Sequence, residues 1–180
     1  MLNKIFQIVN ITLLLVLFGC TQIVEKRYRY DSFKYQDSDF KISGRLVGSF
    51  SESRIDKKTI AYTKGSPYEL VLTFEPISRV KSDIKVINIR IIETKNGKNI
   101  YTIQKVNLKD NGPNNTSNNQ FFSGSSKKFK MPYLDCSIEL TIQFYKENKN
   151  DFIDKKLFFN CTKQYSETKS NAILSILSSA

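Results

Sequence analysis

The chain has 180 residues, 40% of them hydrophobic, which suffices for one domain with a core and is too short to predict two. Its 28 Lys and Arg residues outnumber 17 Asp and Glu residues, a net charge of +11 that favours contact with anionic surfaces. Histidine is absent, which excludes Ser-His and Cys-His nucleophiles, His-based metal sites and His general bases.

The first twenty residues have the pattern of an export signal. Met1 to Lys4 is short and carries one positive charge, and residues 5–18 form an apolar run with only three polar interruptions. A run of about 14 residues is shorter than the ~20 that span a bilayer as a helix. It therefore predicts the hydrophobic region of a signal peptide and not a permanent membrane helix.

The leader ends in Leu17-Phe18-Gly19-Cys20, which resembles the lipobox of bacterial lipoproteins, although Phe18 is bulkier than the usual residue at its position. The resemblance implies that residues 1–19 are removed and that the Cys20 thiol receives diacylglycerol. It also implies that the new amino terminus is acylated, with palmitate among the chains. At ~0.8 kcal/mol per buried methylene, three acyl chains anchor a protein permanently. The alternative is an ordinary secretory signal that happens to end in Gly-Cys.

The resemblance also bears on location. Thr21 follows the cysteine in place of Asp, which by the sorting rule of common Gram-negative bacteria predicts the outer membrane, with the protein facing the periplasm. Exposure on the cell surface stays open, as does the single membrane of a Gram-positive host. Residues 20–38 are polar, charged and Tyr-rich without a period, so we predict a flexible tether that reaches roughly 60 Å when extended.

From residue 39 to 165 the sequence predicts an all-β domain. Apolar and polar residues alternate over 40–46, 68–75 and 136–146, as in half-buried strands, and 84–92 is apolar on both faces, as in a central strand. Asn96-Gly97 predicts a hairpin before a strand at 99–108. Further strands are expected at 155–163 and, more weakly, at 59–63 and 127–133. Seven or eight such strands favour an antiparallel β-sandwich, immunoglobulin- or transthyretin-like.

Two segments interrupt this pattern. Residues 109–119 are almost entirely polar and Asn-rich, so we predict a mobile loop, with a recognition loop as the alternative. Residues 166–180 are predicted to form a short helix and tail. Ser166 would cap this helix, and Ile173, Leu174 and Leu177 would share one side that packs on the domain edge.

Cysteine usage agrees with export. With Cys20 lipidated, Cys136 and Cys161 remain as a pair in a compartment where disulfides persist. In the expected strands Cys136 shares a face with Ile138 and Leu140, and Cys161 shares one with Phe159, so both sulfurs are predicted to point inward. We therefore predict a Cys136–Cys161 disulfide; the alternative is two buried free thiols.

No pattern of catalysis is present. With these cysteines lipidated or paired, no thiolate nucleophile or Cys-rich zinc site is expected. The glycines form no phosphate-binding loop, and acidic residues such as Asp151 and Asp154 are expected in a polar turn. We predict a protein that is not an enzyme, with no cofactor and no metal.

Basic residues form three clusters that are expected at strand ends or turns and are candidates for binding an anionic surface: Lys57 and Lys58; Lys127, Lys128 and Lys130; and Lys155 and Lys156. A solvated basic surface without a ligand is the alternative. Nucleic acid is not expected as a partner in the envelope. The sequence thus predicts a membrane-anchored, non-catalytic lipoprotein that serves as accessory or adaptor of an envelope assembly, for which a secretion apparatus would fit, with a protein partner. The alternative is a module that binds lipopolysaccharide or phospholipid.

Overall fold

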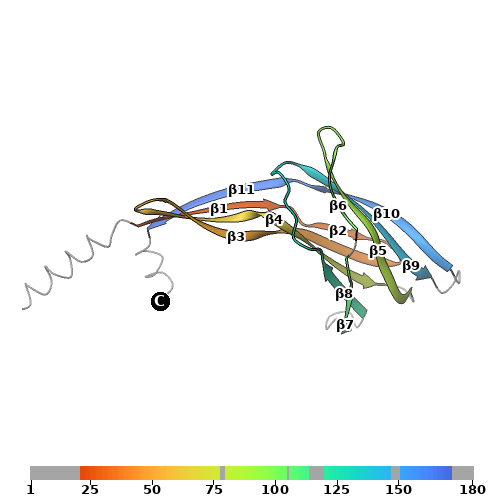
Figure 1. Ribbon diagram of the computed structural model, residues 1–180. Coiled ribbons are helices and arrows are strands. Elements are labelled where there is room, and N and C mark those ends of the chain that lie inside the picture. The colour runs from red at the N-terminus through yellow and green to blue at the C-terminus, as the bar shows by residue number, and fades with distance from the viewer. Residues whose placement is uncertain (1–20, 78–79, 105, 114–119, 147–150, 172–180) are drawn as a thin grey trace, which may run out of the picture. The chain divides into compact units, whose positions relative to one another are not determined.

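The computed structural model describes residues 21–77, 80–104, 106–113, 120–146 and 151–171, and this part of the chain is all-β without a helix (Figure 1). The all-β class predicted from the alternating residues is confirmed. The described strands have these bounds: β1 Gln22–Tyr30, β2 Phe33–Gln36, β3 Phe40–Asp56, β4 Thr59–Pro76, β5 Val80–Glu93, β6 Asn99–Ile103, β7 Lys109–Pro113, β8 Gln120–Ser125, β9 Cys136–Lys146, β10 Asp151–Cys161 and β11 Lys163–Asn171.

The chain divides into two compact units. The hairpin unit comprises Met1–Arg27, Phe50–Lys64 and Tyr165–Ala180. The core unit comprises Tyr28–Ser49 and Gly65–Gln164.

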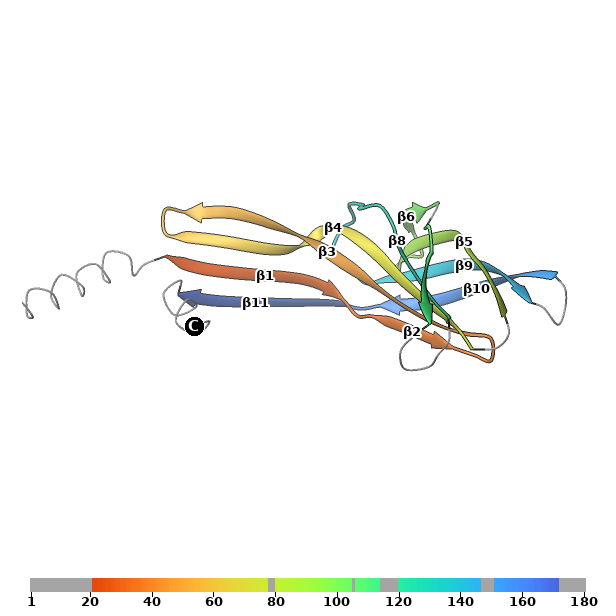
Figure 2. The same cartoon turned by 90° about the horizontal axis from the view of Figure 1, so that it is seen from below.

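The strands form two sheets. The larger has seven strands in the order β11-β1-β4-β3-β2, with β8 beside β4 and β7 beside β8; the smaller has four in the order β10-β9-β5-β6. Figure 2 shows β11, β1, β4 and β3 in neighbouring positions. β1 runs parallel to β4, from Gln22 opposite Thr59 to Arg27 opposite Lys64. The larger sheet is therefore mixed, and the expectation of purely antiparallel pairing is wrong.

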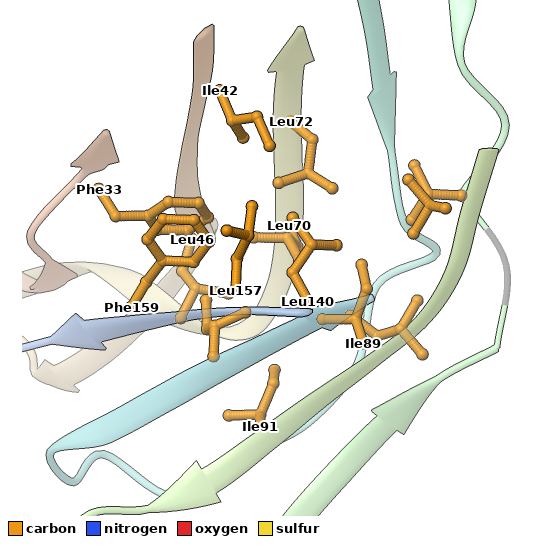
Figure 3. Close-up of a cluster of buried hydrophobic side chains, with 14 of the residues drawn as sticks. Phe33, Ile42, Leu46, Leu70, Leu72, Ile89, Ile91, Leu140, Leu157 and Phe159 are labelled. Atoms are coloured by element: carbon orange, nitrogen blue, oxygen red, sulfur yellow. The ribbon is translucent and has the colours of Figure 1, made fainter. Parts of the chain in front are cut away.

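Side chains from both sheets meet in one hydrophobic core within the core unit (Figure 3). Phe33 of β2 stacks on Phe159 of β10 with ring centroids 4.2 Å apart, and Phe40 of β3 meets Phe144 of β9 edge to face at 5.1 Å. The inward set predicted from period two is confirmed, since alternate residues of β4 and β9 are at most 1% exposed: Tyr68, Leu70, Leu72, Phe74, Cys136, Ile138, Leu140, Ile142 and Phe144.

The apolar strand β5 is central in the smaller sheet, as predicted, because β9 and β6 lie on its two sides. The alternation along β5, in which Ile87, Ile89 and Ile91 would share one face, is nevertheless broken. The register to β9 shifts between Val86 and Asn88, so that Val86 and Ile89 are buried and Ile87 is 44% exposed. A bulge inserts one unpaired residue and reverses the facing of the residues that follow it.

The hairpin predicted at Asn96-Gly97 is confirmed between β5 and β6. Gly97 has a φ of +69°, a conformation that glycine adopts without steric cost, and the Lys98 amide donates to Asn96 Oδ1 at 2.9 Å. Such Asn side-chain bonds to the backbone two residues later stabilise a turn.

Four expectations are corrected. Residues 22–30 and 33–36, within the predicted tether 20–38, form β1 and β2, and residues 109–113 of the predicted loop form β7. Residues 166–171 of the predicted helix belong to β11, while 172–180 lie outside the described residues. The expected strand at 127–133 contributes only a single bridge, Phe129 to Tyr68. β1, β7 and β11 are largely polar and lack a sustained period, and β2 alternates over only four residues; each forms because it pairs with a strand elsewhere in the sheet.

Candidate functional site

A groove of about 470 Å³ lies on the outer face of the larger sheet, within the core unit. Its polar lining comes from adjacent strands: Lys34 and Gln36 of β2, Lys41 and Ser43 of β3, and Thr73 and Glu75 of β4. Phe121 of β8 adds an aromatic side chain. Alternation places these residues outward because their neighbours Ile42 and Phe74 point into the core.

Strand register arranges the polar lining in rows. Lys34 lies opposite Ser43, and Gln36 lies opposite Lys41. Ser43 and Thr73 join their hydroxyls in a 2.5 Å hydrogen bond, which links β3 to β4. These rows give the groove a floor of hydrogen-bonding groups whose spacing is set by the backbone.

The charges of the groove favour an anion. The Lys41 ammonium lies 3.9 Å from the Glu75 carboxylate, a loose ion pair in which the lysine stays 44% exposed. Lys34 adds a second exposed ammonium group. Two cations, one carboxylate, hydroxyls and a phenyl ring can together hold an anionic ligand that also carries hydroxyl groups.

Cys136 and Cys161 are brought together. They are direct partners in the antiparallel β9–β10 pair, each is 1% exposed, and both are free thiols in this structure, so the predicted disulfide is not formed. The predicted inward direction of both sulfurs is confirmed. A hydrogen bond between the two thiols lowers the pKa of Cys136, while the same bond, together with burial, raises the pKa of Cys161.

Lys155 was expected at a strand end or turn, but it lies in the middle of β10, where it bridges the two sheets. Its ammonium binds the carboxylate of Asp37, which follows β2, and lies 5.1 Å and 5.2 Å from the ring centroids of Tyr35 and Phe40. Asp37 also accepts the amides of Asp39 and Phe40 at 2.8 Å and 3.0 Å. Lys155 is thus part of the packing between β10 and the β2–β3 turn.

The environment of this pair sets the ionisation of Asp37. Burial by itself raises the pKa of the carboxyl. The Lys155 ammonium, the amides of Phe40 and Asp39 and the Tyr35 hydroxyl outweigh that effect and lower the pKa to about 2. Both side chains are therefore charged at neutral pH and neutralise one another.

Lys156 lies on the opposite face of β10 and is also engaged. Its ammonium is 3.2 Å from a carboxylate oxygen of Glu139, which Arg90 approaches to 3.7 Å. Glu139 is among the buried charged residues of the described chain. Because Lys155 and Lys156 point to opposite faces and both have acidic partners, they do not form the predicted basic patch.

The other predicted clusters are exposed. Lys127, Lys128 and Lys130 flank residues that hold this segment to the edge of β4: the Leu70 amide donates to Ser126 Oγ at 3.0 Å, and the Phe129 amide donates to the Tyr68 carbonyl at 2.8 Å. Phe129, which lies between Lys128 and Lys130 in the sequence, is buried and stacks on Tyr101. Lys57 and Lys58 form the turn between β3 and β4 in the hairpin unit. Cys20, the predicted lipidation site, lies outside the described residues.

The sequence prediction missed the groove. The alternation over 40–46 did place Lys41 and Ser43 on the outer face, but β2 was assigned to the tether, and Phe121 was not singled out. No local signal joins Lys34 to Glu75, since only the strand order brings both to one groove.

Within the described residues, no group of three or more acidic or Cys side chains is placed to hold a metal ion. In the same part of the chain, no helix has the length and apolar character needed to cross a bilayer. Comparison of the chain with protein-family models, with curated proteins and with solved structures found no match, so the groove is assigned by its own geometry alone.

Proposed function

We propose that this protein is a membrane-anchored, non-catalytic lipoprotein of the cell envelope that acts as accessory or adaptor of an envelope assembly. The observation that carries the proposal is the lipobox-type ending of the leader at Cys20, with only Thr21 between it and the first strand. In this proposal the acylated chain resides in the outer membrane, faces the periplasm and contacts a protein partner there.

The arrangement of the strands supports binding to a protein partner. The hydrophobic residues of two sheets are used to build the core, while β10 and β6 remain as edge strands of the smaller sheet. An edge strand offers unpaired backbone groups to a partner. We further propose that the core unit is a β-sandwich, which its facing sheets support; the likeness to immunoglobulin or transthyretin domains stays a prediction.

An oxidised state of the cysteine pair belongs to the same proposal. Cys136 and Cys161 are opposite one another in register, a placement whose typical Cα separation of about 4.5 to 5.5 Å lies within the range of disulfides. In an oxidising envelope the two thiols would lose two hydrogens to the cell's thiol oxidants and form one bond between β9 and β10.

The adaptor role is tested by mild cross-linking of intact cells, extraction of the lipidated full chain and identification of the proteins bound to it. One recurrent protein partner, enriched over a matched lipoprotein of equal abundance, supports the proposal. Salt-sensitive recovery of lipid without a recurrent protein contradicts it.

A second candidate, a module that binds an anionic envelope ligand such as lipopolysaccharide or phospholipid, is favoured by the groove. Lys34 and Lys41 supply its positive charge, and the Ser43–Thr73 pair supplies hydroxyls. Binding of lipopolysaccharide by the lipidated chain in neutral detergent, compared between wild type and K34Q/K41Q, tests this function. K127Q/K128Q, which removes the same charge elsewhere in the core unit, is the control. Equal loss in both variants contradicts a specific site.

A further inference from the structure

The turn between β3 and β4 lies beside the first residue of β1. The Gln22 amide donates to the Lys58 carbonyl at 2.7 Å, and Gln22 is the register partner of Thr59. Six consecutive partners, from Gln22 with Thr59 to Arg27 with Lys64, continue this parallel pairing. The turn is therefore held next to the start of β1 by a backbone ladder and not by side chains alone.

This position places the turn close to the proposed anchor, and the inference rests on that proposed function. Cys20 precedes Gln22 by two residues, so its Cα lies at most about 7 Å from that of Gln22. Neighbouring strands are about 4.8 Å apart, which brings Thr59 within about 12 Å of the acylated residue. The surface nearest to the turn is then the headgroup layer of the membrane that holds the acyl chains.

The turn has the charge that such a surface attracts. Arg54, Lys57 and Lys58 are exposed, and among the described residues the two lysines make no ion pair. The Asp56 carboxylate accepts the Lys58 amide at 2.7 Å, a bond within the turn itself. The described residues of the hairpin unit include seven basic side chains and four acidic ones, an excess of three positive charges.

The hairpin unit also exposes apolar side chains. Ile55, beside the turn, is 57% exposed. Phe50, at the other end of the β3 segment of this unit, is 67% exposed, with the Lys64 ammonium 4.9 Å from its ring centroid. Val24 and Ala61 are the only buried hydrophobic residues among the described residues of this unit. Basic residues interleaved with exposed apolar ones are the composition of segments that lie on the surface of anionic membranes.

We propose that the β3–β4 turn, residues 54–58, docks on the anionic phospholipid headgroups of the leaflet that holds the acyl chains. Lys57 and Lys58 contact the phosphates, and Ile55 contacts the interface. The acyl chains hold the protein at the membrane, and the turn gives the hairpin unit a second point of contact. This second contact restricts the tilt of the hairpin unit relative to the membrane.

The test uses the absence of tryptophan from the chain, which makes a single introduced tryptophan a unique probe. Ile55→Trp reports on the turn, and Phe158→Trp, at a position 64% exposed in the core unit, is the matched probe. The lipidated full chains are reconstituted into vesicles of phosphatidylcholine with or without phosphatidylglycerol. Tryptophan emission and its quenching by brominated lipids are then recorded at low and high salt. Intact mass confirms the acyl chains beforehand.

The expected result is a blue-shifted, bromolipid-quenched emission of the I55W chain only in anionic vesicles and only at low salt, with no change for F158W. In the I55W background, K57Q/K58Q should lower the docking equilibrium about 25-fold, since each basic residue near an anionic surface contributes about fivefold. The same neutralisation at Lys127 and Lys128 should leave the docking equilibrium unchanged.

Three results overturn the inference. If the I55W chain has the same emission in neutral and anionic vesicles, the turn does not dock on anionic headgroups, and the proposed anchor is unaffected. If K127Q/K128Q lowers the docking equilibrium as much as K57Q/K58Q does, the binding is a general attraction of the net charge and not a contact of the turn. An intact mass without acyl chains refutes the proposed anchor and, with it, the position of the turn at the membrane.

Discussion

Replacement of Lys155 by methionine should destabilise the core unit by about 1 to 1.5 kcal/mol at pH 7. Lys155 neutralises Asp37 between the two sheets, and K155M preserves much of the side-chain length while removing the charge. The pKa of Asp37 falls from 3.8 to about 2, which corresponds to roughly 2.5 kcal/mol. Two backbone amides and the Tyr35 hydroxyl also contribute to this lowering of the Asp37 pKa. The side chains of Asp37 and Lys155 remain 19% and 30% exposed, and water screens their interaction. Lys155 therefore accounts for only part of the roughly 2.5 kcal/mol.

The pH dependence has a definite sign. Because the folded pKa of Asp37 is depressed, its contribution to stability is fully present above the unfolded pKa of about 3.9 and is lost as pH falls through about 2. Burial lowers the pKa of Lys155, but Asp37 and Tyr35 together raise it by more, so the pKa lies above its usual value. Its contribution is therefore present below the unfolded lysine pKa of about 10.4 and is lost as pH rises above that value. The difference between wild type and K155M should be largest between these limits.

Urea unfolding followed by tyrosine fluorescence measures this difference, since the chain has nine Tyr and no Trp. The free energy of unfolding of wild type, K155M and K156M is compared at pH 7 and near pH 2. K156M is the matched control: it removes the neighbouring charge on the opposite face, where Glu139 keeps Arg90, and should cost less than about 0.5 kcal/mol. Equal costs for the two variants, or a K155M cost that persists unchanged near pH 2, would refute the reasoning.

Other predictions concern the anchor, the cysteine pair and a close backbone contact. Cys20→Ser should abolish acyl labelling of the protein in cells, and equal labelling of mutant and wild type removes the lipoprotein proposal. Protein taken from the envelope should weigh about 2 Da less before reduction than after it, and Cys136→Ala should cost roughly 2 to 5 kcal/mol by chemical unfolding; two freely alkylated thiols would show that no disulfide forms. Gly48→Ala should cost about 1 to 3 kcal/mol in the same assay, because a Cβ there lies 2.8 Å from the Gly65 carbonyl oxygen; an unchanged unfolding midpoint contradicts that contact.

The inward face of each regular strand was predictable from sequence because burial acts on every second residue. Ile138, Leu140 and Ile142 are fully buried in β9, as their spacing predicted. Ile87 is exposed, although the same spacing would bury it, because a bulge interrupts the pairing of β5 with β9. The sequence of β5 alone contains no signal for this bulge.

The polar strands were not predictable in this way. β1 and β11 have no sustained period, and β11 has Tyr165 as its only aromatic or aliphatic residue, so it offers no alternating apolar face. They form strands because neighbours distant in sequence supply their hydrogen bonds, β4 for β1 and β1 for β11. Local propensity is weak compared with a complete ladder of backbone hydrogen bonds. The predictions of a flexible tether and of a C-terminal helix were therefore wrong over the described residues.

The sequence by itself determined the all-β class, the inward residues of β4 and β9, the excess of basic residues and the absence of histidine chemistry. It also contains the lipobox resemblance on which the proposed anchor rests. Only the tertiary structure decided which polar residues become neighbours: Lys155 with Asp37, Lys41 with Glu75, and the Lys58 carbonyl with Gln22. The physical reason is that burial imposes a period along the chain, whereas contacts between polar residues depend on strand order and register, which turns and bulges far apart in the sequence set together.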